Sequence, residues 1–95
     1  QYTYLNHKLT PASEALVPVT DRGFRFGDGV FETIRVHGGV PYRFEWHMQR
    51  LTAGLKAANI VFDSNNLPSE CADLLRRNQC GEGLLRIQVT RGSSG

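Results

Sequence analysis

The sequence predicts an α+β fold in which an antiparallel sheet packs against two helices. Apolar and polar residues alternate over 29–37 and 85–90, which is typical of half-buried strands. Apolar residues recur at helical spacing over 44–58 and 68–78. The predicted order is two strand pairs, two helices and a final strand. This order differs from the strict strand and helix alternation of a doubly wound parallel fold.

Two hairpins are expected before the first helix. Residues 2–10 form the opening hairpin, because aromatic and β-branched residues flank turn formers at 6–7. Two glycines at 38–39 then turn the strand 29–37 back into a short strand over 40–43. Both pairs are therefore predicted to be antiparallel.

The strand over 29–37 presents two different faces. One face combines Glu32 with three apolar residues, Val30, Ile34 and Val36. The other face bears Phe31, Thr33, Arg35 and His37. A buried Glu32 needs a partner, and we consider Arg22, Arg25 and Arg35 as candidates. A structural ion pair and a general-base role both stay open for Glu32.

The apolar stripe of the first helix consists of Met48, Leu51, Leu55 and Ala58, with Arg50 at its margin. An arginine at such a margin can bury its stem and present a rigid fork of donors to phosphate or carboxylate. It can equally be a solvated helix residue. His47, one turn earlier, is interpreted as a packed or surface histidine. The second helix is expected to bury Cys71, Leu74 and Leu75.

Composition excludes several classes of protein. The 95 residues are 40% hydrophobic, which suits one small domain, and 11 basic against 9 acidic residues leave a charge of only +2. So weak a charge does not favour nucleic acid or anionic lipid as a partner. No apolar run approaches the roughly 20 residues of a membrane span, and the start lacks signal-peptide features, so we expect a cytoplasmic protein.

The cysteines do not indicate a metal site. Cys71 and Cys80 lack the CxxC spacing of zinc ligands, and two cysteines make a poor disulfide framework. We expect both to be reduced and structural, and we expect no metal.

Glycines, aromatic residues and charges interleave over residues 22–32, which indicates a tight and functionally placed loop. A phosphate-cradling loop requires glycines that open a helix. These glycines open a strand instead, so a nucleotide loop is disfavoured. Arg86 and Arg91, near the end of the chain, are either ligands for an anionic substrate or surface charges.

Four segments in order resemble the class IV aminotransferases, a family that groups branched-chain and D-amino-acid aminotransferases with 4-amino-4-deoxychorismate lyase. These segments are 4–8, 21–35, 47–51 and 85–92. The resemblance implies that residues 1–95 are the small amino-terminal domain of a two-domain enzyme. A carboxy-terminal domain would supply the lysine that holds pyridoxal phosphate, and two copies would form a homodimer.

The resemblance also assigns roles to individual residues. Arg50 matches the arginine that grips the cofactor phosphate, and Phe31 matches an aromatic residue of the substrate pocket. Arg86 and Arg91 lie near a substrate-carboxylate loop that continues past residue 95. The two lysines of the chain, Lys8 and Lys56, do not match the cofactor lysine. We therefore assign no catalytic residue and expect residues 1–95 alone to be inactive.

The sequence is compatible with three functions. The first is a pyridoxal-phosphate aminotransferase acting on an amino acid of the branched-chain kind. The second is a lyase acting on aminodeoxychorismate, because one scaffold serves both reactions. The third is a non-catalytic binding or dimerisation module, which the mass of the protein in its source would distinguish from a longer enzyme.

Overall fold

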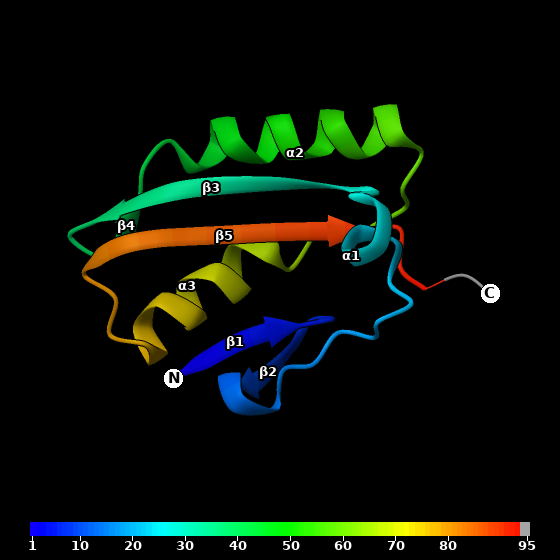
Figure 1. Ribbon diagram of the computed structural model, residues 1–95. Coiled ribbons are helices and arrows are strands. Elements are labelled where there is room, and N and C mark those ends of the chain that lie inside the picture. Colours follow the sequence, from blue (N-terminus) through cyan, green and yellow to red (C-terminus); the bar gives the residue numbers. More distant parts are fainter. Residues whose placement is uncertain (94–95) are drawn as a thin grey trace.

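The computed structural model describes residues 1–93, which form two antiparallel sheets and three α-helices (Figure 1). The opening strands are β1 (Tyr2–Leu5) and β2 (Lys8–Pro11), followed by a 3-10 turn at Ala12–Glu14. The other elements are α1 (Arg22–Phe26), β3 (Gly29–His37), β4 (Val40–Pro41), α2 (Phe44–Ala58), α3 (Leu67–Arg77) and β5 (Glu82–Thr90).

The central sheet has the order β4-β3-β5, and β3 pairs with β5 along their full lengths. Ile34 and Val36 of β3 are almost fully buried, and Phe31 on the opposite face is exposed. The predicted alternation along β3 is therefore confirmed. Alternation along β5 is confirmed in the same way, since Leu85, Ile87 and Val89 are buried.

Both long helices cover one face of this sheet. Leu51 and Leu55 of α2 share the core with Leu67, Cys71 and Leu75 of α3 and with the buried residues of β3 and β5. Figure 1 shows α2 running along β3 and α3 lying under β5. The other face of the sheet therefore stays uncovered over residues 1–93.

The opening hairpin forms a separate sheet that docks on α3. The Tyr4 hydroxyl donates to Asp73 at 2.6 Å, and His7 Nδ1 lies 3.0 Å from Glu70. The prediction of one antiparallel sheet is thus modified, because these polar contacts fasten the hairpin to a helix and not to a strand. Within residues 1–93, no helix is long and apolar enough to cross a membrane.

A short helix, α1, replaces part of the loop predicted over 22–32. The Asp21 carboxylate accepts hydrogen bonds from the backbone N–H groups of Gly23 at 2.9 Å and Phe24 at 3.3 Å. Gly27 ends the helix in the left-handed conformation, with φ 66°. An aspartate cap and a glycine stop are the usual helix signals, and the sequence contained both.

The remaining boundaries agree closely with the predictions. The helix expected over 44–58 is α2, and the helix expected over 68–78 is α3, shifted by one residue. The short strand expected over 40–43 ends at Pro41, because Arg43 takes a left-handed conformation with φ 53°. The last strand begins three residues earlier than predicted, at Glu82.

Candidate functional site

Arg86 and Phe31 form one candidate site on the uncovered face of the sheet. The Arg86 guanidinium carbon lies 4.2 Å from the centroid of the Phe31 ring, which is a cation–π contact. Arg86 Nη1 also donates to the Thr33 hydroxyl at 3.3 Å, and Nε donates to the Gln88 amide oxygen at 3.4 Å. These three neighbours hold an exposed guanidinium over an aromatic ring, an arrangement suited to a carboxylate ligand.

Glu32, His47 and Arg50 form a second cluster between β3 and α2. Glu32 is only 7% exposed, and its Oε1 lies 2.6 Å from His47 Nδ1. Its other oxygen, Oε2, lies 3.7 Å from Arg50 Nε. The Arg50 guanidinium carbon is also 4.9 Å from the centroid of Trp46. The cluster pairs a buried carboxylate with an arginine whose side chain is 58% exposed.

The three arginines considered as partners of Glu32 were the wrong candidates. Arg22 pairs with Asp28 at 2.8 Å, and Arg25 lies over the Phe26 ring. Arg35 is exposed on the opposite face of β3. The Glu32 side chain points toward the face covered by α2, so residues of that helix reach it.

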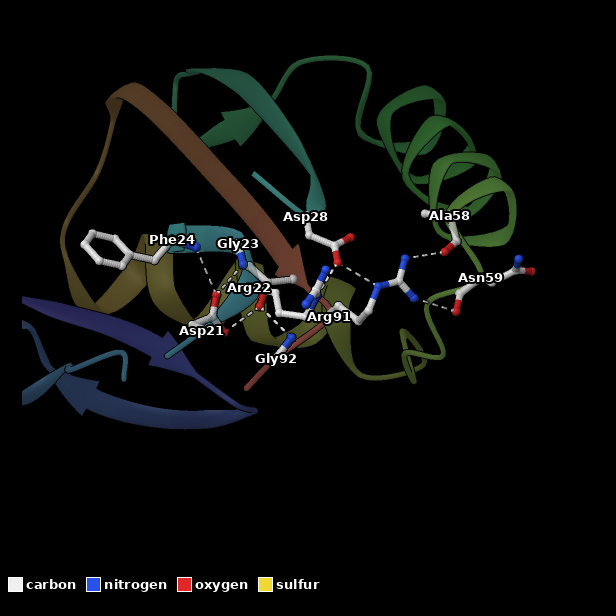
Figure 2. Close-up of polar contacts among 10 residues, drawn as sticks. Asp21, Arg22, Gly23, Phe24, Asp28, Ala58, Asn59, Arg91 and Gly92 are labelled. Atoms are coloured by element: carbon white, nitrogen blue, oxygen red, sulfur yellow. Dashed lines mark hydrogen bonds and ion pairs between the residues drawn. The ribbon is translucent and has the colours of Figure 1, made fainter. Parts of the chain in front are cut away.

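A third cluster joins the start of β3 to the ends of α2 and β5 (Figure 2). Asp28 Oδ2 accepts hydrogen bonds from Arg91 Nε and Arg22 Nε, each at 2.8 Å. Arg91 Nη2 donates to the carbonyl oxygen of Ala58 at 2.7 Å, and Nη1 donates to that of Asn59 at 3.4 Å. The hydrogen bonds from Arg91 and Arg22 lower the pKa of Asp28 below its usual value.

Asp21 fastens α1 to the end of β5. Besides capping the helix, its carboxylate accepts from the Thr90 hydroxyl at 2.8 Å. The Arg22 backbone N–H donates to the Gly92 carbonyl at 2.9 Å. The segment over 22–32 is thus a structural junction in addition to the start of β3.

A scan against family models gives one match, Amino-transferase class IV, over residues 29–95. This range begins at the first residue of β3 and includes the cluster of Glu32, His47 and Arg50. The chain belongs to the class IV aminotransferases. The sequence-based resemblance to this family is therefore confirmed.

A curated relative of this class IV aminotransferase chain is a D-alanine aminotransferase from Bacillus licheniformis. The two are 37% identical over 91 residues, which make up 94% of the chain and 32% of the relative. The chain therefore spans about a third of the length of the curated relatives it matches.

Solved structures show the same fold. A branched-chain amino acid aminotransferase from Escherichia coli matches with a TM-score of 0.90 and 27% identity, over 99% of the chain and 33% of that structure. A 4-amino-4-deoxychorismate lyase from Pseudomonas aeruginosa matches with a TM-score of 0.77 and 36% identity, over 90% of the chain and 30% of that structure. A hypothetical aminotransferase from Mycobacterium tuberculosis, in its PLP-bound form, matches with a TM-score of 0.83 and 28% identity, over 93% of the chain and 32% of that structure. The predicted α+β fold is confirmed.

The four site residues predicted for this class IV aminotransferase chain lie in three places. Phe31 and Arg86 contact each other on the uncovered face of the sheet. Arg50 lies on α2, which covers the opposite face, and is joined to β3 through Glu32. Arg91 belongs to the Asp28 junction. Sequence reasoning missed Trp46, Thr33 and Gln88, whose contacts depend on pairing between strands and on the helix turn.

Proposed function

We propose that the full-length protein is a pyridoxal-phosphate-dependent aminotransferase acting on an amino acid, and that residues 1–95 are its amino-terminal domain. Membership of the class IV aminotransferases supports this reaction, and the PLP-bound form of the Mycobacterium tuberculosis relative supports the cofactor. The share of 32% that the chain covers in a D-alanine aminotransferase is consistent with a missing second domain. That domain would supply the lysine, so residues 1–95 alone would not catalyse amino transfer.

The observation that carries the proposal is the setting of Arg50. Its Nε faces Glu32, and its two terminal nitrogens make no hydrogen bond within the described residues 1–93. An arginine fork of this kind binds the oxygens of a phosphate in pairs. The donor chemistry therefore fits the phosphate of pyridoxal phosphate. When bound, this cofactor supplies the electron sink for reactions of amino acids, and Arg50 would hold it in place.

The Phe31 and Arg86 pair is proposed to receive the substrate. Phe31 offers an aromatic surface, and Arg86 offers a cation that is already fixed by three neighbours. An amino acid carries a carboxylate that such a cation would bind. Asp28 and two backbone carbonyls already accept hydrogen bonds from Arg91, so fewer of its donors are left for a substrate. A role of Arg91 in substrate binding stays a prediction. The homodimer also stays a prediction.

Absorbance spectroscopy on the full-length protein tests the cofactor. Added pyridoxal phosphate should produce the absorbance band of an enzyme-bound cofactor, and Arg50→Ala should weaken its binding. The enzyme should then transfer the amino group of D-alanine or a branched-chain amino acid to 2-oxoglutarate. An absence of the band in both proteins would contradict the proposal.

A lyase acting on aminodeoxychorismate is the second candidate. The structural match to the Pseudomonas aeruginosa lyase, with 36% identity, favours keeping it. Release of pyruvate from aminodeoxychorismate without amino transfer from any amino acid would select the lyase. A non-catalytic module would show neither reaction and would bind no cofactor.

A further inference from the structure

We propose that Glu32 is a positioning residue that orients Arg50 for the cofactor phosphate. This inference rests on the proposed role of Arg50 and adds a residue that holds it in place. Glu32 lies on β3, in the layer beneath α2, and would not itself touch the phosphate. Its task would be to fix the direction in which the guanidinium of Arg50 points.

Because Glu32 is buried, its carboxylate is held in one position. Its side chain is 7% exposed and shares its strand face with Ile34 and Val36, which are almost fully buried. A carboxylate in such surroundings is costly unless its oxygens are paired. His47 Nδ1, at 2.6 Å, engages Oε1. The second oxygen is thereby directed toward Arg50, whose Nε lies 3.7 Å away.

The atom that faces Glu32 decides what Arg50 can still bind. A guanidinium has five N–H donors, one on Nε and four on the terminal nitrogens. Since Nε faces the carboxylate, the terminal pair is left for an oxyanion, and a phosphate can accept from both nitrogens at once. Glu32 therefore occupies the side of Arg50 that a phosphate does not need.

Trp46 supports Arg50 from a second direction. The guanidinium carbon is 4.9 Å from the Trp46 ring centroid, and the Trp46 ring meets His47 edge-on at 5.1 Å. Glu32, His47 and Trp46 thus form one connected support. A long side chain loses rotamer freedom when it binds a ligand, and holding it in advance reduces that loss. The support should therefore appear as tighter phosphate binding.

The experiment measures the cofactor dissociation constant of the full-length enzyme by absorbance titration. Glu32→Gln keeps the shape of the side chain but removes its charge, and we expect about tenfold weaker binding of pyridoxal phosphate. The rate at saturating cofactor should change less than the dissociation constant. Inorganic phosphate should also protect the apoenzyme from heat less well in this variant than in the unmodified protein.

Glu70→Gln is the matched control. Glu70 is a carboxylate paired with a histidine, His7, and its side chain is 12% exposed, close to the 7% of Glu32. Glu70 lies on α3, where it contacts the opening hairpin through His7 and makes no contact with Arg50. We expect this control to leave the cofactor dissociation constant unchanged.

A double-mutant cycle separates positioning from general structural damage. If Glu32 acts through Arg50, then Glu32→Gln adds nothing further once Arg50→Ala is present. The inference would be overturned if the double variant weakened cofactor binding by the product of the two single-variant factors. An unchanged dissociation constant in Glu32→Gln when Arg50→Ala weakens binding would overturn it too. If Arg50→Ala itself has no effect, the proposed phosphate role fails first.

Arg50→Lys provides a second route that leaves the buried carboxylate intact. Lysine keeps the charge but lacks both the Nε donor and the planar fork. We expect about tenfold weaker cofactor binding in this variant. Binding as tight as in the unmodified enzyme would show that a point charge is enough, and it would overturn the inference even if Glu32→Gln failed to fold.

Discussion

Arg91 and Asp28 are 63 positions apart in the chain, yet Arg91 Nε donates to Asp28 Oδ2 at 2.8 Å. The same guanidinium donates to the Ala58 carbonyl at the end of α2. One side chain therefore joins the residue before β3, the last turn of α2 and the residue after β5, as Figure 2 shows. The junction holds the helix that carries Arg50 against the sheet.

We expect Arg91→Ala to lower the free energy of unfolding by about 1–2 kcal/mol, because it removes charge-assisted hydrogen bonds. The expected loss is modest because the Arg91 side chain is 41% exposed and solvent screens such pairs. Urea unfolding measures the change. Arg35→Ala, an exposed arginine of β3, is the control and should be nearly neutral.

Asp28→Asn should destabilise the protein in a pH-dependent way. The pKa of Asp28 is lowered in the folded state, mainly by the hydrogen bond from Arg91. Its ionised form therefore stabilises the fold above its ordinary pKa of 3.8, and this contribution is lost as the pH falls through the lowered folded value. Unfolding midpoints of Asp28→Asn and the unmodified protein should differ at pH 7 and converge in acid. A constant difference at every pH would contradict this origin.

Gly29→Ala should be strongly destabilising. A β-carbon at Gly29 would lie 2.5 Å from the Val89 carbonyl oxygen and 3.0 Å from the Thr90 α-carbon, both backbone atoms of the paired strand. We expect a loss of about 1–3 kcal/mol, typical of overpacking, by thermal or urea unfolding. Gly81→Ala has open space around it, so it should be neutral or slightly stabilising.

The two cysteines should differ in reactivity. Both thiols are free, but Cys71 is buried, and burial raises the pKa of its thiol to about 11. Cys80 is only partly buried. Iodoacetamide at pH 8 should therefore label Cys80 first in the native protein, and both should react equally in urea. Mass spectrometry of the labelled peptides would reveal the order, and faster labelling of Cys71 would refute it.

Arg86→Ala should raise the KM of the full-length enzyme for its amino-acid substrate by about tenfold or more, since a charged hydrogen bond to the carboxylate is lost. Arg35→Ala serves as the control, because Arg35 lies on the same face of β3 as Phe31 but does not contact the Phe31 ring. Steady-state kinetics would decide. An unchanged KM would remove Arg86 from the proposed substrate site.

Much of the fold could be predicted because it depends on local patterns. The alternation in β3 and β5 and the helical stripe of α2 follow from side-chain periods of two and 3.6 residues. The helix α1 was missed although Asp21 and Gly27 mark its ends. Both capping residues lie in or beside a glycine-rich segment, and such a composition is more typical of a loop than of a helix.

The partners of Glu32 could not be predicted from the sequence. The need for a partner followed from a carboxylate on an apolar strand face, but its identity depended on which helix covers that face. Arg22, Arg25 and Arg35 are near in sequence, whereas His47 and Arg50 are near in space. A strand pattern indicates which side chains are buried and does not indicate what they are buried against.

The sequence by itself determined the family, the α+β class, most element boundaries and the faces of the two long strands, because these depend on motifs and on residues close together in the chain. Tertiary structure alone decided the docking of the opening hairpin on α3, the contact between Arg86 and Phe31, and the junction around Asp28. These contacts join residues far apart along the chain, so only the packing of helices and strands brings them within bonding distance.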